Sequence, residues 1–141
     1  MLEFALGWSM LWLLFSGVYQ YGYSFYVYNR LMVAVTNAAE LGSKINYDTS
    51  NPSAYTTTLQ NMVLYGDETA GTSTVVSGLT ASQVNVSVTT TGASSVPTDV
   101  TITIGSTTTP YVINGFFGSI SLTGKPRATV KYLGLAQCSS C

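Results

Sequence analysis

The sequence of 141 residues contains no histidine and few charges, since Asp, Glu, Lys and Arg together make up 8% of it. That fraction is about a third of the ~25% usual in soluble domains. The lack of histidine excludes a Ser-His-Asp triad and the common histidine metal sites, and the few carboxylates are scattered along the chain. The net charge of −1 provides no electrostatic attraction to nucleic acid. We therefore expect no enzyme, no cofactor, no metal site and no nucleic-acid partner.

Proline and charge are both missing from the N-terminal part of the chain. The first proline is Pro52, and no residue from Phe4 to Asn29 is charged. Good helix formers on both sides of this stretch predict one helix from about Leu2 to about Ile45, roughly 65 Å long at 1.5 Å per residue. The uncharged part exceeds the ~20 residues that a membrane-spanning helix needs. It therefore predicts a membrane-spanning segment, with the helix continuing outside the bilayer from Arg30.

The ends and the middle of this hydrophobic segment add detail. No basic region precedes it and no small-residue cleavage site follows it, so an ordinary signal peptide is a poor interpretation. Either a leader is removed in front of it, or it is an N-terminal anchor. Gly17 and Gly22 make its middle the weakest helical part, where local unwinding is easiest. A fragment that starts near Leu31 is expected to be soluble and monomeric, with the cover of its sheet intact.

Residues 46–141 predict a globular, β-rich domain. A short amphipathic helix is expected near residues 53–65, with Ser53 as its N-cap and Gly66 as its stop. After a Gly/Thr/Ser loop at 67–82, apolar and polar residues alternate as in strands. The predicted strands cover residues 84–89, 100–104, 111–113, 116–122 and 128–133.

The predicted fold class is therefore α+β. A long hydrophobic helix, residues 1–45, continues into a small antiparallel sheet of four or five strands. One face of such a sheet is apolar and needs a cover. We expect the outer half of the long helix to provide this cover through Val33, Val35 and Leu41.

Aromatic residues form a stripe along the predicted helix. They recur every three or four residues, which places side chains on one helical face: Trp8, Trp12, Phe15, Tyr19, Tyr23 and Tyr26. Small residues between them permit close approach of a second helix. We interpret the rings as packing between helices of neighbouring chains, and an electron-conducting stack of rings as the less favoured alternative.

Several segments resemble a known family. LEFALGWSMLWLLFSGVYQYGYSFYVYNRLMVAVTNAAELGS, LQNMVLYGD, GLTASQVNVSV and LTGKPRATVKYLG together resemble TadE-like proteins, the tight-adherence pilins and pseudopilins related to type IV pilins. The resemblance covers most of the chain and implies a pilin-like, lollipop-shaped fold. It also implies a structural subunit that polymerises through its N-terminal helix into an extracellular pilus (fimbrium) for surface adhesion.

The resemblance further implies partners. These are copies of the chain itself, the cytoplasmic (inner) membrane before assembly, a prepilin peptidase and the pilus assembly machinery. Two other functions stay open: a minor pilin or pseudopilin that primes assembly, and a membrane-anchored binding module that does not polymerise.

Glu3 takes a specific role under this resemblance. A carboxylate in an apolar helix bundle is costly unless it is paired, and the implied partner is the α-amino group at Met1 of a neighbouring chain. The alternative is an unpaired Glu3 at the cytoplasmic membrane surface. The family's glutamate is usually fifth from the mature end, so either Met1 is not the native first residue or this filament uses a shorter offset.

Cys138 and Cys141 form a CxxC pair near the end of the sequence. Zinc would need two further ligands, and redox CxxC motifs open a helix on a thioredoxin-like fold. A disulfide is the default in an exported protein. It closes within one chain or, alternatively, links neighbouring chains.

A basic group lies on or beside the last predicted strand, and consists of Lys125, Arg127 and Lys131. It is either a solvated strand face or an intersubunit patch. In the second case its partners would be the acidic residues Asp67, Glu68 or Asp99.

Overall fold

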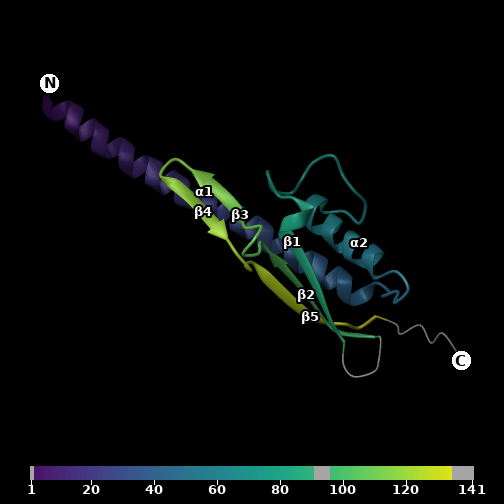
Figure 1. Cartoon of the computed structure of the whole chain (residues 1–141). Coiled ribbons are helices and arrows are strands. Elements are labelled where there is room, and N and C mark those ends of the chain that lie inside the picture. Colours follow the sequence, from purple (N-terminus) through teal and green to yellow (C-terminus); the bar gives the residue numbers. More distant parts are fainter. Residues whose placement is uncertain (1, 91–95, 135–141) are drawn as a thin grey trace, which may run out of the picture.

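The structure is a computed structural model that describes residues 2–90 and 96–134. Its longest element is helix α1 (Leu2–Lys44), which continues through Gly17 and Gly22 without a break. The N-terminal part of α1 protrudes, while its C-terminal half lies against the other elements (Figure 1). The predicted long helix is confirmed, and the helix does not unwind at its glycines.

The shorter elements follow α1 in chain order. They are α2 (Pro52–Tyr65), the 3-10 helix η1 (Ala81–Gln83), and the strands β1 (Val84–Thr90), β2 (Pro97–Ile104), β3 (Tyr111–Gly115), β4 (Gly118–Leu122) and β5 (Arg127–Lys131). The long helix packed on antiparallel strands makes an α+β, pilin-like arrangement, which confirms the predicted fold class.

The five strands form two sheets, and the prediction of a single sheet is wrong. One sheet has the order β1-β2-β5, and the other is the β3–β4 hairpin; both are antiparallel. The chain leaves the first sheet at Gly105 and returns at Gly124, with φ angles of 71° and 68°. The Gly124 N–H donates to the Gly105 carbonyl at 3.0 Å. These left-handed residues turn the hairpin away from the first sheet, because strands cannot continue straight through positive φ.

The core lies between the three-stranded sheet and the two helices. Val100, Ile102 and Ile104 of β2 are fully buried, as are Leu59 and Val63 of α2. Burying each such side chain stabilises the fold by about 1.5–3 kcal/mol. The predicted alternation is confirmed in β1, where the valines are buried or half-buried and the residues between them are exposed. In β2 the apolar residues alternate with threonines, of which Thr101 is buried as well.

The covering face of α1 differs in part from the prediction. Val35 is buried and Leu41 packs against the core, but Val33 is 59% exposed. Residues two apart on a helix are rotated by about 200°, so Val33 and Val35 point to opposite sides. The buried apolar side chains of α1 are Val27, Leu31, Ala34, Val35, Ala38 and Ala39. The covering face therefore begins before Arg30.

Hydrogen bonds fix the C-terminal end of α1 to α2 and to the residue that follows β5. The Tyr132 hydroxyl donates to the Ile45 carbonyl at 3.0 Å and accepts from the Tyr47 N–H at 2.8 Å. The buried Tyr55 hydroxyl donates to the Gly42 carbonyl at 2.5 Å. Burial raises the pKa of Tyr55 above its ordinary value, with smaller contributions from Tyr132 and Tyr47. This phenol therefore stays a neutral donor at physiological pH.

The caps of α2 explain where it begins and ends. The N-cap is Asn51 and not the predicted Ser53: Asn51 Oδ1 accepts from the Ala54 N–H at 3.3 Å. Pro52 is the first helical residue, a position where the missing N–H of proline has no cost. The N-cap is therefore the residue before Pro52. The predicted stop is confirmed, because Gly66 has a φ of 75° and its N–H donates to the Met62 carbonyl at 3.0 Å.

We expect Asn51→Ala to lower the free energy of unfolding by about 1 kcal/mol, the usual cost of losing an N-cap. Ser53→Ala is the matched control, because Ser53 donates its hydroxyl to Asn51 Oδ1 and caps no backbone N–H itself. Urea denaturation followed by circular dichroism measures both losses. A larger loss for Ser53→Ala than for Asn51→Ala would contradict the assignment.

Candidate interaction surface

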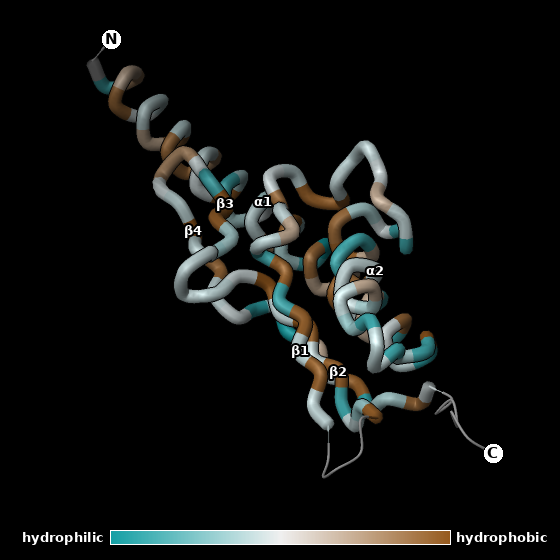
Figure 2. The backbone as a smooth tube through the Cα atoms, turned by 45° about the vertical axis from the view of Figure 1, so that its right-hand side comes forward, coloured by the Kyte–Doolittle hydropathy of each residue, from teal (hydrophilic) through white to brown (hydrophobic). Residues whose placement is uncertain are grey.

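The protruding part of α1 exposes apolar side chains on all sides. Every residue from Glu3 to Phe15 is exposed, and Phe4, Trp12 and Phe15 are 76%, 63% and 65% exposed. Hydrophobic residues recur along the whole protruding segment (Figure 2). A helix that is apolar all round is normally a buried helix. This segment therefore needs a surface that covers it.

The predicted aromatic stripe lies on this exposed surface. All six of its members are exposed: Trp8, Trp12, Phe15, Tyr19, Tyr23 and Tyr26. Among the described residues, the ring pairs in contact are Phe4–Trp8, Tyr47–Tyr55 and Phe116–Phe117. None of these pairs joins two members of the stripe, so within one chain the stripe is no stack of rings.

The β3–β4 hairpin lies along α1 and is held there by Gln20. The Gln20 side chain accepts from the Phe117 N–H at 2.7 Å and donates to the Gly118 carbonyl at 3.2 Å. A Cβ at Gly115 would collide with the same Gln20 side chain, so glycine permits this close approach. One carboxamide thereby binds the turn of the hairpin to the helix.

Apolar hollows flank the hairpin on two faces of α1. Two hollows of about 340 and 410 Å³ adjoin each other on the stripe side and share Tyr19 and Phe116. A third, of about 300 Å³, lies between Tyr21–Tyr28 and the hairpin residues Ile113, Ile120 and Leu122. No charged residue lines any of these three hollows.

Sequence reasoning missed this contribution of the hairpin. It placed Phe116 and Phe117 in a strand, whereas they form the exposed turn between β3 and β4. A signal was present, because Gly115 and Gly118, two glycines only three residues apart, are typical of a turn. The contact with Gln20 had no such signal, since the two segments lie 97 residues apart.

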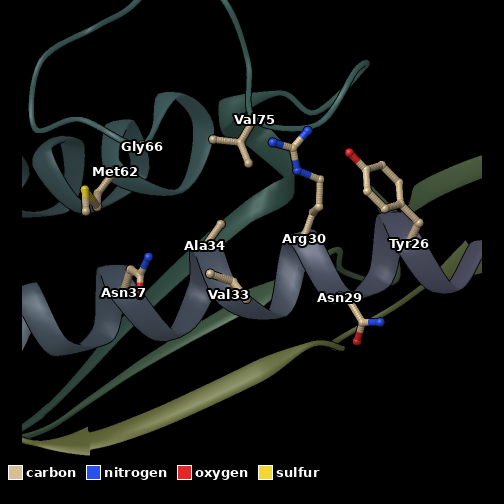
Figure 3. A pocket seen from close by; sticks show the side chains of 9 residues that line it. All are labelled: Tyr26, Asn29, Arg30, Val33, Ala34, Asn37, Met62, Gly66 and Val75. Atoms are coloured by element: carbon tan, nitrogen blue, oxygen red, sulfur yellow. The ribbon is translucent and has the colours of Figure 1, made fainter.

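A separate hollow of about 410 Å³ lies between α1 and the α2 side of the domain (Figure 3). Arg30 and Tyr26 project from α1 towards the loop that carries Val75. The Arg30 guanidinium carbon lies 5.6 Å from the centre of the Tyr26 ring, a cation–π distance. The lining residues include no carboxylate and no nucleophile with a base.

Two features are absent from the described part of the chain, and they concern metals and membranes. Residues 2–90 and 96–134 contain no group of three side chains among His, Cys, Asp and Glu that could hold a metal ion. In the same residues, no helix has the length together with the apolar character that a membrane crossing requires. This second finding contradicts the membrane-spanning segment predicted within Phe4–Asn29. Trp, Tyr, Gly, Ser and Gln interrupt its aliphatic residues, and amphipathic rings favour a membrane boundary over hydrocarbon.

Other predicted site residues lie near the chain ends. Glu3 is exposed in the first turn of α1. Met1, its predicted partner on a neighbouring chain, lies outside the described residues, as do Cys138 and Cys141. The pairing of Glu3 and the disulfide therefore stay predictions.

The predicted basic group is exposed along β5. Arg127 and Lys131 are strand residues, Lys125 shortly precedes them, and Asp99 of β2 lies opposite Lys131 within the same chain. Asp67 accepts hydrogen bonds from the Thr69 N–H and hydroxyl at 2.9 and 2.8 Å, which lower the pKa of its carboxyl. Glu68 is exposed beside Asp67. Of the three acidic residues, Asp99 is the one that the sheet register places opposite a basic residue.

Comparisons of the chain with protein-family models, curated proteins and solved structures find no match. The resemblance to TadE-like pilins thus rests on the quoted sequence segments. Independently of it, the fold is a pilin-like α+β arrangement in which a long N-terminal helix packs on antiparallel strands.

Proposed function

We propose that this chain is a structural subunit of a filament and polymerises through the exposed part of α1. The observation that carries the proposal is the uncharged helix surface from Phe4 to Phe15, exposed on all sides beside a folded domain. Its apolar side chains lose contact with water when other chains surround them. A catalytic role has no comparable support among the described residues.

Energetics favour several neighbours over one. Burying half a dozen large apolar side chains contributes on the order of 10 kcal/mol. Association itself costs about 4–15 kcal/mol, so one helix–helix contact is marginal. A two-fold dimer also covers one face of each helix, whereas repeated head-to-tail contacts build a filament. A bundle of helices in a filament covers every face of α1.

The resemblance to TadE-like pilins supports the finer proposal. Under it, the filament is an extracellular pilus for surface adhesion, built from copies of this chain by a pilus assembly machinery after cleavage by a prepilin peptidase. The exposed domain carries few charges and many Ser and Thr residues. Such a neutral surface suits a protein exposed in bulk outside the cell.

The test is to purify surface filaments from the cells that produce this chain and to identify the repeating subunit by mass spectrometry and electron microscopy. We expect this chain to be the repeating subunit. Filaments in which another protein repeats and this chain is present in a few copies would make it a minor pilin. Absence of the chain from all filaments would contradict the proposal.

We further expect Glu3→Ala to reduce filament yield while leaving the monomer folded. Glu3 is exposed in the monomer, so its loss uncovers no core. In the assembled bundle the α-amino group of the neighbouring chain would lose its charge partner. Glu40→Ala, which removes another exposed carboxylate of α1, is the control. Normal yield from Glu3→Ala would end the pairing hypothesis.

A further inference from the structure

We infer that the groove between α1 and the tip of the β3–β4 hairpin receives the Phe4–Phe15 segment of α1 from a second copy of this chain. We call this groove the hairpin groove. Its lining consists of the aromatic residues Trp12, Phe15, Tyr19, Tyr23 and Phe116 together with Ser16, Gln20, Asn114 and Gly115. The inference rests on the proposed function and deepens it. It adds the β3–β4 hairpin to an interface that sequence reasoning assigned to the helix alone.

The hairpin groove consists of the two adjoining hollows on the stripe side of α1. They measure about 340 and 410 Å³ and have Tyr19 and Phe116 in common. Phe116 is 80% exposed at the tip of the hairpin, and its ring lies edge-on to that of Phe117 at 5.2 Å. Rings of the helix and a ring of the hairpin thus form opposite walls of one apolar groove.

The wall made by the hairpin is fixed before any partner binds. Gln20 makes one hydrogen bond to the Phe117 N–H and one to the Gly118 carbonyl, and Gly115 leaves room for its side chain. A preformed site loses little conformational freedom on binding, which favours association. Gln20 is therefore a positioning residue for Phe116.

The chemistry of the groove selects its occupant. No charged residue lines it, and none occurs in Tyr111–Leu122 of the hairpin. A charged partner would lose its hydration without gaining an ion pair. The occupant is therefore apolar, uncharged and exposed before assembly. Among the described residues, the protruding helical segment Phe4–Phe15 has all three properties.

Spacing matches this occupant to the groove. The α1 residues that line the two hollows are centred about 5–6 positions apart, or about 8 Å along the helix. Phe4 and Trp8 of the protruding segment have ring centres 6.4 Å apart, so neighbouring rings of a second copy suit neighbouring hollows. We assume that both helices run in the same direction, as head-to-tail assembly requires. Phe4 and Trp8 of one copy then face the two hollows of the other copy when the copies are offset by about 12 residues, or about 18 Å.

Photo-cross-linking of the full chain tests the inference. We would place p-benzoylphenylalanine at position 116, assemble a mixture of unlabelled and nitrogen-15-labelled chains, irradiate it and map the cross-links by mass spectrometry. We expect cross-links between labelled and unlabelled chains that join position 116 to residues 4–15. The same photoreactive group at Leu133, an exposed apolar residue at 76%, is the control and should not reach that segment.

Two variants provide a second readout. Phe116→Ser and Gln20→Ala should each lower filament yield by about tenfold or more, the effect of about 1.4 kcal/mol per contact. Phe116→Ser should do so with unchanged circular dichroism, because Phe116 is exposed in the monomer. Leu133→Ser should leave the yield unchanged. Filaments whose cross-links from position 116 avoid residues 4–15 of other chains would overturn the inference and leave the proposed function standing. A wild-type chain that forms no filaments would overturn both.

Discussion

Gly105→Ala is expected to lower the free energy of unfolding by about 3 kcal/mol or more, because the added methyl group meets both conformational strain and a backbone collision. Gly105 has a φ of 71°, which costs an L-residue about 1–2 kcal/mol. A Cβ there would also collide with the Leu122 backbone carbonyl and lie 3.2 Å from the Tyr111 nitrogen. Neither atom can yield without breaking the junction between the two sheets, so the clash adds to the conformational strain.

Gly78→Ala separates these two contributions. Gly78 has a similar φ of 79°, but nothing lies within 4 Å of the position that its Cβ would take. Its replacement should therefore cost only the conformational term of about 1–2 kcal/mol. Urea denaturation of both variants measures the difference. Equal losses would show that the collision at Leu122 is relieved without cost, against our expectation.

Removal of residues 1–16 is expected to abolish filament formation and to leave a folded, soluble monomer. This deletion removes the exposed apolar segment Phe4–Phe15 and retains Gln20, which holds the hairpin, and Val27, which is buried in the core. Negative-stain electron microscopy and sedimentation measure assembly. Filaments formed by residues 17–141 would place the polymer interface in the globular part and contradict the proposed function.

Removal of residues 1–30 is expected to damage the fold as well. The sequence predicted that a fragment starting near Leu31 would be soluble, with the cover of its sheet intact. In the structure, however, the β3–β4 hairpin packs on the turns of α1 from Gln20 to Tyr28. Without these turns, the buried side chains of Tyr111 and Ile113 lose part of their cover. Hydrogen exchange in residues 111–122 should be fast in this fragment and slow in residues 17–141. Equal protection in both fragments would show that the hairpin needs no helix beneath it.

Together these experiments distinguish two roles of α1, which are assembly with other chains and packing against the sheet. Its first half is exposed and is proposed to bind other chains, while its second half covers a sheet. The turns around Gln20 and Tyr23 serve both roles, since they contact the hairpin and line the proposed groove. Substitutions in this zone should therefore affect assembly and local order together.

The sequence by itself determined the elements that depend on local pattern. Missing proline and good helix formers predicted α1, a glycine predicted the end of α2, and alternation of apolar and polar residues predicted the strand faces. These signals are read within a few residues, because helix and strand periods are short. The sequence also predicted that the first part of α1 packs against neighbouring chains, because no residue from Phe4 to Asn29 is charged.

The tertiary structure alone decided how these elements meet. The split into two sheets depends on the left-handed turns at Gly105 and Gly124, and the choice of Val35 over Val33 depends on which side of α1 faces the sheet. The bond from Gln20 to the hairpin joins segments 97 residues apart, and no local pattern encodes such a contact. The spacing of apolar residues along the sequence specifies which face of a helix or strand is apolar. Which other element covers that face is decided by packing, because many elements present similar apolar surfaces.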